Sequence, residues 1–355
     1  MWFFLSMWFF LSMFVLIMVP FQMVQALKPV KISEIELTFH LGDSITAGFG
    51  IDGLSGGLTE HRGFSCFAGG DQDAITLPNL IENHRTYYQP HANKLYGPSK
   101  SWHAVELCYG LICPPFQRRE SDVLNLAQSG AMVGNLDNQV TVLLQRLQKV
   151  DDWESKMKLG TLFIGANDMC LQCWDKVSGG ARYETDLIKV VKRIKEKLPN
   201  TILQIYKIFK LSGLIDLSKK KTGCSNLHRI TFIECDCAFG PGVKSLDHLR
   251  TMDELAGRYN EVIESLIERV PPSDTFGFKI QRLFEHLDIS SFPGSALSSI
   301  DCFHPSLQGH ERIAINMWNV LSSKNGTFKS YSATPIKYGE NTFIAQEERY
   351  NISPE

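Results

Sequence analysis

The chain has 355 residues, of which 44% are hydrophobic, and it carries 38 acidic and 36 basic side chains. A formal net charge of -2 excludes the polycationic surface that binds nucleic acid through bulk electrostatics, so we expect no nucleic-acid partner. A content of 22 phenylalanines and 21% charged residues excludes a largely disordered chain.

The N-terminal segment is apolar and repetitive. Residues 1–24 contain no charged side chain, and the hexapeptide MWFFLS occurs twice in tandem over residues 1–12. Val24 and Ala26 are small residues at the positions that a signal peptidase reads. We therefore expect residues 1–26 to be a cleaved signal peptide and the mature protein to be secreted and soluble. The run is also long enough to be an uncleaved anchor, so a membrane-tethered protein is the alternative.

The C-terminal segment differs from the rest of the mature chain. We expect residues 27–322 to form one catalytic domain and residues 323–355 to form a polar tail. Asn325 and Asn351 lie in glycosylation sequons, which fit an exported protein with a solvated tail.

Strand and helix patterns alternate between these two segments. Apolar runs predict strands over residues 35–41, 123–127, 159–164, 202–208 and 276–284, and apolar residues at helical spacing predict helices over about 136–150, 249–267 and 308–321. Residues 49–73 and 96–122 fit neither pattern and are expected to be long loops. The alternation predicts an α/β fold, a three-layer α/β/α sandwich with a mostly parallel central sheet. Ligands of such sheets bind beyond the carboxyl ends of the strands.

The cysteines indicate an oxidising compartment. Nine follow the apolar segment: Cys66, Cys108, Cys113, Cys170, Cys173, Cys224, Cys235, Cys237 and Cys302. We expect most of them to form disulfides, with one thiol left free or paired between chains. The C-x-x-C and C-x-C pairs that begin at Cys170 and Cys235 leave a zinc site as a weaker alternative, because the spacing lacks the regularity of two C-x-x-C pairs.

A serine, a histidine and an aspartate follow predicted strands or precede the last predicted helix. Ser44, in Gly42-Asp43-Ser44, comes directly after the first strand. His304 is the candidate base that would activate this serine, and Asp301 lies three residues before it, so one turn could supply both the imidazole and its orienting carboxylate.

Hydrogen-bond donors for a developing oxyanion also follow predicted strands. The candidates are the side-chain amide of Asn167 and the backbone N–H groups of Gly130 and Ser44. Asn125 and Asp168 are expected to brace the loops on which these donors lie.

These blocks, in this order, resemble the GDSL or SGNH hydrolases. The resemblance implies that Ser44 is the nucleophile, that Gly130 and Asn167 belong to the oxyanion hole, and that Asp301 and His304 complete the triad. Residues 62–65, 76–80, 163–173 and 301–304 make the chain similar to the phospholipase B-like branch of animals.

The resemblance implies a serine esterase that deacylates phospholipids or lysophospholipids through an acyl-enzyme, without a metal ion or cofactor. A lipid substrate would bring the enzyme into transient contact with a membrane surface. An esterase for short-chain or carbohydrate acyl esters is one alternative. A non-catalytic secreted binding protein is another, which the presence of all five site residues disfavours.

Overall fold

The computed structural model describes residues 27–28, 30–108, 119–171, 179–222, 235, 237, 246–286 and 289–322. The expected signal peptide, the C-terminal tail with Asn325 and Asn351, and Cys113, Cys173 and Cys224 lie outside these residues. Across the described ranges, no helix has both the length and the apolar character needed to cross a bilayer.

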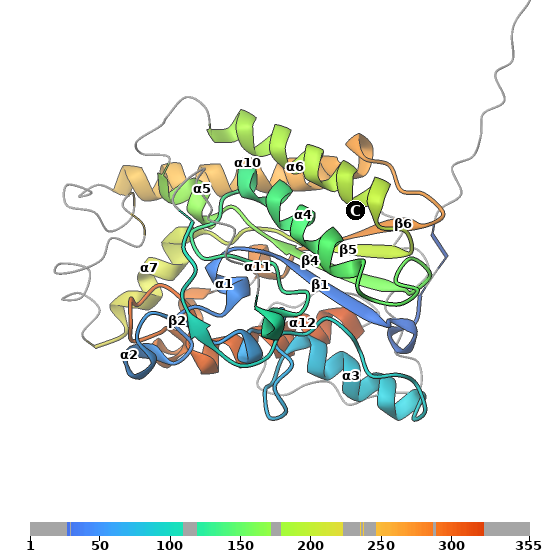
Figure 1. The fold of residues 1–355 in the computed structure, drawn as a ribbon. Coiled ribbons are helices and arrows are strands. Elements are labelled where there is room, and N and C mark those ends of the chain that lie inside the picture. The colour runs from blue at the N-terminus through green and yellow to red at the C-terminus, as the bar shows by residue number, and fades with distance from the viewer. Residues whose placement is uncertain are drawn as a thin grey trace, which may run out of the picture.

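A four-stranded parallel sheet lies at the centre of the molecule (Figure 1). Its strands, in spatial order, are β1 (Leu37–Gly42), β4 (Lys158–Phe163), β5 (Thr201–Tyr206) and β6 (Phe276–Gln281). Each strand pairs in parallel with the next, and every residue of β1, β4 and β5 is buried. Burial on both faces explains why apolar residues predominate in these strands.

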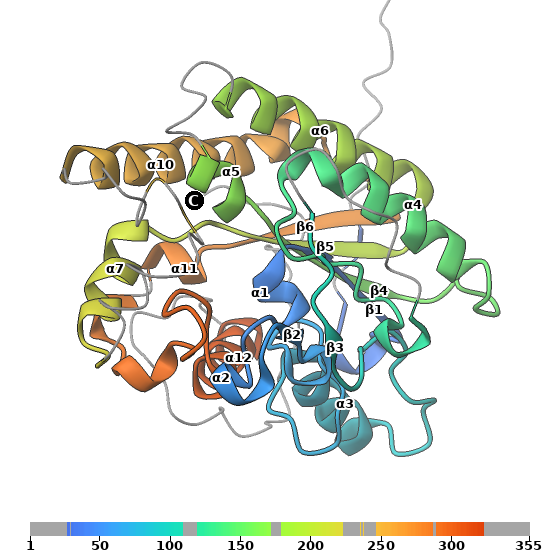
Figure 2. The same ribbon diagram turned by 60° about the vertical axis from the view of Figure 1, so that its left-hand side comes forward.

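Helices cover both faces of this sheet, as Figures 1 and 2 show. The longer helices of the described chain are α3 (Leu77–Tyr88), α4 (Leu136–Leu147), α6 (Gly179–Lys197), α7 (Leu211–Lys219), α10 (Leu246–Arg269) and α12 (Leu307–Ser322). Helices α4, α6 and α10 pack together on one face, and α3 packs with α12 on the other. The predicted three-layer α/β/α sandwich is therefore confirmed.

The prediction of a strand over residues 123–127 is wrong. This segment runs beside β1 but forms only an isolated bridge, in which His40 N–H donates to Leu124 O and Leu126 N–H donates to His40 O. The ladder does not extend, because Thr38 N–H donates to Tyr96 O and Gly42 N–H donates to Gln139 Oε1. The carbonyl groups of Asn125 and Ala127 accept hydrogen bonds from the buried guanidinium of Arg62. The last predicted strand is also shorter than expected. Strand β6 ends at Gln281, and the short helix α11 (Leu283–His286) follows.

The two predicted loops, residues 49–73 and 96–122, each contain a short strand, and these two strands pair with each other. Strand β2 (Thr59–Glu60) in the first loop pairs antiparallel with β3 (His103–Ala104) in the second, and α2 (Gly53–Gly56) precedes β2. Helices α3, α6 and α7 were not predicted.

The cysteines of the described residues are mostly oxidised. Cys170 and Cys235 form a disulfide, so these two are not the thiolate ligands that the zinc alternative requires. Cys108, Cys237 and Cys302 are also disulfide-bonded, whereas the buried Cys66 is a free thiol.

Candidate active site

The carboxyl end of β1 presents Ser44 at the start of a helix. Helix α1 (Ser44–Ala47) begins directly after Asp43, whose Oδ1 accepts the Ile45 N–H at 3.1 Å and caps the helix. A Cβ at Gly42 would lie 2.5 Å from Phe163 O and from Thr46 Oγ1, so only glycine fits where the chain turns from strand to helix. Strand, glycine and cap together fix the position of Ser44.

Gln139 clamps the same turn from α4. Its Oε1 accepts the Gly42 N–H at 3.0 Å, and its Nε2 donates to Gly42 O at 2.8 Å. Gln139 is not among the residues predicted from the sequence, although a signal for it exists. Gln139 is a polar side chain on the buried stripe of α4, with Leu136 and Leu143 three and four residues away on the same face.

A tight turn before α12 holds the imidazole and the carboxylate. Ser298 N–H donates to His304 O at 2.8 Å, and Cys302, between Asp301 and His304, takes a left-handed φ of 57°. Asp301 Oδ1 accepts the backbone N–H groups of Phe303 and His304 at 2.9 and 3.0 Å. The turn thus orients the Asp301 carboxylate toward the ring of His304, the last residue of the same turn.

The structure brings the three predicted triad residues together. His304 Nε2 lies 2.6 Å from Ser44 Oγ, and His304 Nδ1 lies 2.5 Å from Asp301 Oδ2. With Asp301 ionised, Nδ1 must carry the proton that it donates to the carboxylate, and Nε2 is left to accept from the serine hydroxyl. These distances have the geometry that a Ser-His-Asp triad requires.

Burial strengthens the electrostatics of these groups. Ser44, Asp301 and His304 are 7%, 5% and 3% exposed, so water screens their interactions weakly. Burial alone would raise the pKa of Asp301. The charge of His304, its hydrogen bond and two backbone N–H groups outweigh burial and hold the pKa of Asp301 below its usual value. Asp301 is therefore ionised at neutral pH and can stabilise the imidazolium that forms during proton transfer.

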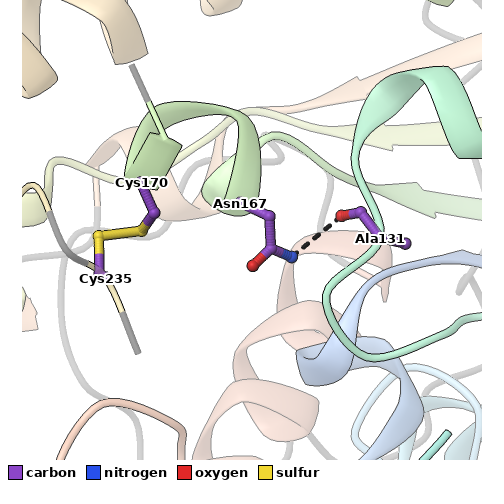
Figure 3. Close-up of a disulfide and its surroundings, with 4 residues drawn as sticks. All are labelled: Ala131, Asn167, Cys170 and Cys235. Atoms are coloured by element: carbon purple, nitrogen blue, oxygen red, sulfur yellow. Dashed lines mark hydrogen bonds between the residues drawn. A yellow bond between two sulfur atoms is a disulfide. The ribbon is translucent and has the colours of Figure 1, made fainter. Parts of the chain in front are cut away.

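Two of the predicted oxyanion donors, Ser44 and Asn167, follow the neighbouring strands β1 and β4, and Gly130 follows the bridged segment 123–127 beside β1. Gly130 has a left-handed φ of 76°, and a Cβ there would lie 2.4 Å from Cys108 O, so this turn requires glycine. Within the described residues, the N–H groups of Ser44 and Gly130 donate to no protein acceptor. Asn167, in α5 (Ala166–Leu171) after β4, donates one amide hydrogen to Ala131 O at 2.9 Å (Figure 3). Its second amide hydrogen remains available for a substrate oxyanion.

Asn125 and Asp168 have the bracing contacts that we expected. Asn125 Nδ2 donates to Thr46 O at 3.3 Å, and Asp168 accepts the Val133 N–H at 3.1 Å. Burial raises the pKa of Asp168 to about 7. Each side chain ties an oxyanion-donor segment to another part of the site.

An apolar pocket is lined by chain neighbours of the serine and the histidine, although neither Ser44 nor His304 lines it. Ile45, next to Ser44 in the chain, lines it, as do Phe303 and Pro305 on either side of His304. The remaining lining residues are Phe163, Phe209, Leu214, Leu217, Phe284, Ile289, Phe292, Ala296, Leu297, Gly309 and Ile313.

The chain is similar to known proteins over most of its own length. Membrane-associated phospholipase B1 of Homo sapiens is 28% identical over 314 residues, which are 83% of this chain and 20% of that protein. Its counterpart from Mus musculus is 27% identical over 330 residues, covering 88% of this chain and 21% of that protein. The chain thus spans about a fifth of the length of these relatives.

An extracellular lipase from Streptomyces rimosus, a solved structure, is 16% identical, with 77% of this chain and 94% of that chain covered and a TM-score of 0.34. The family model described as GDSL-like Lipase/Acylhydrolase matches residues 38–317, which include all five predicted site residues. Because this match extends over most of the chain, the chain belongs to the GDSL-like lipase/acylhydrolase family of ester hydrolases.

Proposed function

We propose that this chain is a secreted serine esterase that deacylates phospholipids or lysophospholipids. Ser44 attacks the ester carbonyl while His304 Nε2 takes its proton. The N–H groups of Ser44 and Gly130 and the amide of Asn167 stabilise the oxyanion. His304 then protonates the leaving alcohol, and water hydrolyses the acyl-enzyme by the same route.

The apolar pocket is the observation that supports a lipid as the substrate. Ile45, Phe303 and Pro305, which line it, are chain neighbours of the nucleophile and the base, and all of its lining residues are apolar, as an acyl chain requires. Each buried methylene contributes about 0.8 kcal/mol, so a long acyl chain gains affinity in this pocket that an acetyl group does not. Similarity to proteins named phospholipase B1 supports the same substrate class.

Acyl-chain preference tests the proposal. The purified protein is assayed on diacyl phospholipid, lysophospholipid and short-chain esters side by side, with Ser44→Ala as the blank. Ile289→Trp should narrow the pocket and lower turnover of long-chain esters by about tenfold, equivalent to losing about two methylene contacts, while short-chain turnover persists. Ile188→Trp, on α6 and outside the pocket lining, is the matched control. Activity confined to acetyl esters would contradict the phospholipase proposal.

Export forms a separate part of the proposal. It is supported by the apolar segment before residue 27 and by the disulfide between Cys170 and Cys235. Mass spectrometry of the mature N-terminus after expression in a secreting host should identify residue 27 as the first residue. A mature protein that retains residues 1–26 in the membrane fraction would instead support the tethered alternative.

A further inference from the structure

A buried ion network lies behind the segment that carries Gly130. Glu60 and Arg62 have fully buried side chains. Arg62 Nη2 and Nε donate to Glu60 Oε2 at 2.8 and 3.1 Å, and Arg62 Nε lies 3.4 Å from Asp122 Oδ1. Burying such groups is costly, and replacing a buried pair by apolar residues is often neutral for stability, so stability alone is a weak explanation for the network.

The network holds three alternate residues of one short segment. Arg62 Nη1 donates to Asn125 O at 3.1 Å, and Nη2 donates to Ala127 O at 2.8 Å. Glu60 Oε1 accepts the Ser129 hydroxyl at 2.6 Å. These contacts cover the five residues directly before Gly130, and they originate more than 60 positions away in the chain.

Ser129 connects the network to the Gly130 N–H. The carbonyl oxygen of Ser129 and the N–H of Gly130 belong to one planar trans peptide, in which they point in opposite directions. Cys108 N–H donates to Ser129 O at 2.7 Å, and Glu60 holds the Ser129 side chain. Fixing Ser129 at both points fixes the direction of the Gly130 N–H.

We propose that Glu60 and Arg62 are positioning residues that act through residues 125–129 to aim the Gly130 N–H at the reacting carbonyl. The inference rests on the oxyanion role of Gly130 in the proposed function. Neither side chain contacts the triad through any hydrogen bond of the described residues. Their effect is on the geometry of a donor whose direction decides how well it stabilises the transition state.

The test uses Ser129→Ala, which removes the Glu60 contact without leaving a buried charge unpaired. Activity is measured on p-nitrophenyl butyrate, so the outcome does not depend on whether phospholipid is the preferred substrate. We expect kcat to fall about 10- to 100-fold with KM within about twofold, since losing an oxyanion donor outright costs about 100- to 1,000-fold. The affinity of a trifluoromethyl ketone, which mimics the tetrahedral intermediate, should fall by a similar factor. In Glu60→Gln the amide oxygen must face the two Arg62 donors, so its NH₂ group can donate to the Ser129 hydroxyl oxygen, and this variant should retain more activity than Ser129→Ala.

Thr201→Val is the matched control, because it removes a buried hydroxyl bound to Pro199 O at the opposite end of the sheet. Urea unfolding of all variants separates positioning from stability. If Ser129→Ala is destabilised but keeps kcat and ketone affinity within twofold of the parent, the network is structural and the inference is wrong. If the parent itself hydrolyses p-nitrophenyl butyrate no faster than Ser44→Ala does, the proposed function fails first.

Discussion

Replacing Asp301 by asparagine should move the ring proton of His304 from Nδ1 to Nε2 while preserving the turn. Asp301 Oδ1 accepts two backbone N–H groups, from Phe303 and His304. An asparagine must keep its carbonyl oxygen at that position, because an amide NH₂ there would face two donors. Its NH₂ then takes the place of Oδ2, 2.5 Å from His304 Nδ1.

The consequence for Ser44 follows directly. An NH₂ group opposite Nδ1 requires that nitrogen to accept, so the ring proton moves to Nε2. Nε2 would then donate to Ser44 Oγ instead of accepting its proton, and the base would be lost. The same change in a serine protease triad lowers kcat by about four orders of magnitude, or about 5.5 kcal/mol of transition-state stabilisation.

The assay is kcat/KM on p-nitrophenyl butyrate at pH 7.5 (about neutral, where Asp301 is ionised in the parent). Circular dichroism confirms that the variant is folded. Asp137→Asn is the matched control, since it removes a partly exposed carboxylate that pairs with Arg193 on the surface. More than a tenth of parental activity in folded Asp301→Asn would refute the assignment of the tautomer and of the base.

Two further predictions concern stability. The Cys170–Cys235 disulfide closes a loop of 65 residues, so the double serine variant should lose about 4 kcal/mol of unfolding free energy in urea, and an unchanged midpoint would contradict this. Burial opposes protonation of His103, but its hydrogen bonds to Asp122 and to Ala104 O raise its pKa. Because the pKa is higher in the folded state, this contribution is fully present below the unfolded value of about 6.5 and is lost as pH rises through the folded value. Unfolding free energy measured from about pH 6 to about pH 9 should therefore fall more steeply in the parent than in His103→Gln, and equal slopes would contradict the assignment.

The elements that the sequence predicted correctly are those whose signal is local. Strands β1, β4 and β5 are rich in apolar residues, and their predicted limits differ from the observed ones by one or two residues. The periodic apolar residues of α4, α10 and α12 likewise reflect one buried face in each helix. Asp301 and His304 could be paired because they lie three residues apart.

The failures depend on distant partners. Residues 123–127 have the composition of a strand, but distant residues end the ladder with β1, because Tyr96 O accepts the Thr38 N–H and Gln139 Oε1 accepts the Gly42 N–H. No local pattern contains that information. Helix α3 did carry a local signal, because Thr76 caps it and a proline follows in its first turn. The pocket is formed by residues from five or more separate segments, so only the fold reveals it.

The turn that carries both Asp301 and His304 has a consequence for regulation of the base. In many serine hydrolase folds the carboxylate and the imidazole come from separate segments, so loop movement disturbs their mutual contact. Here any displacement of residues 301–304 carries both groups together, because the carboxylate is bound to the backbone of the same turn. Movement of the turn would change the reach to Ser44 but leave the basicity and tautomer of His304 intact. Movement of this turn would therefore alter the distance from His304 Nε2 to Ser44 Oγ before it altered the contact between His304 and Asp301.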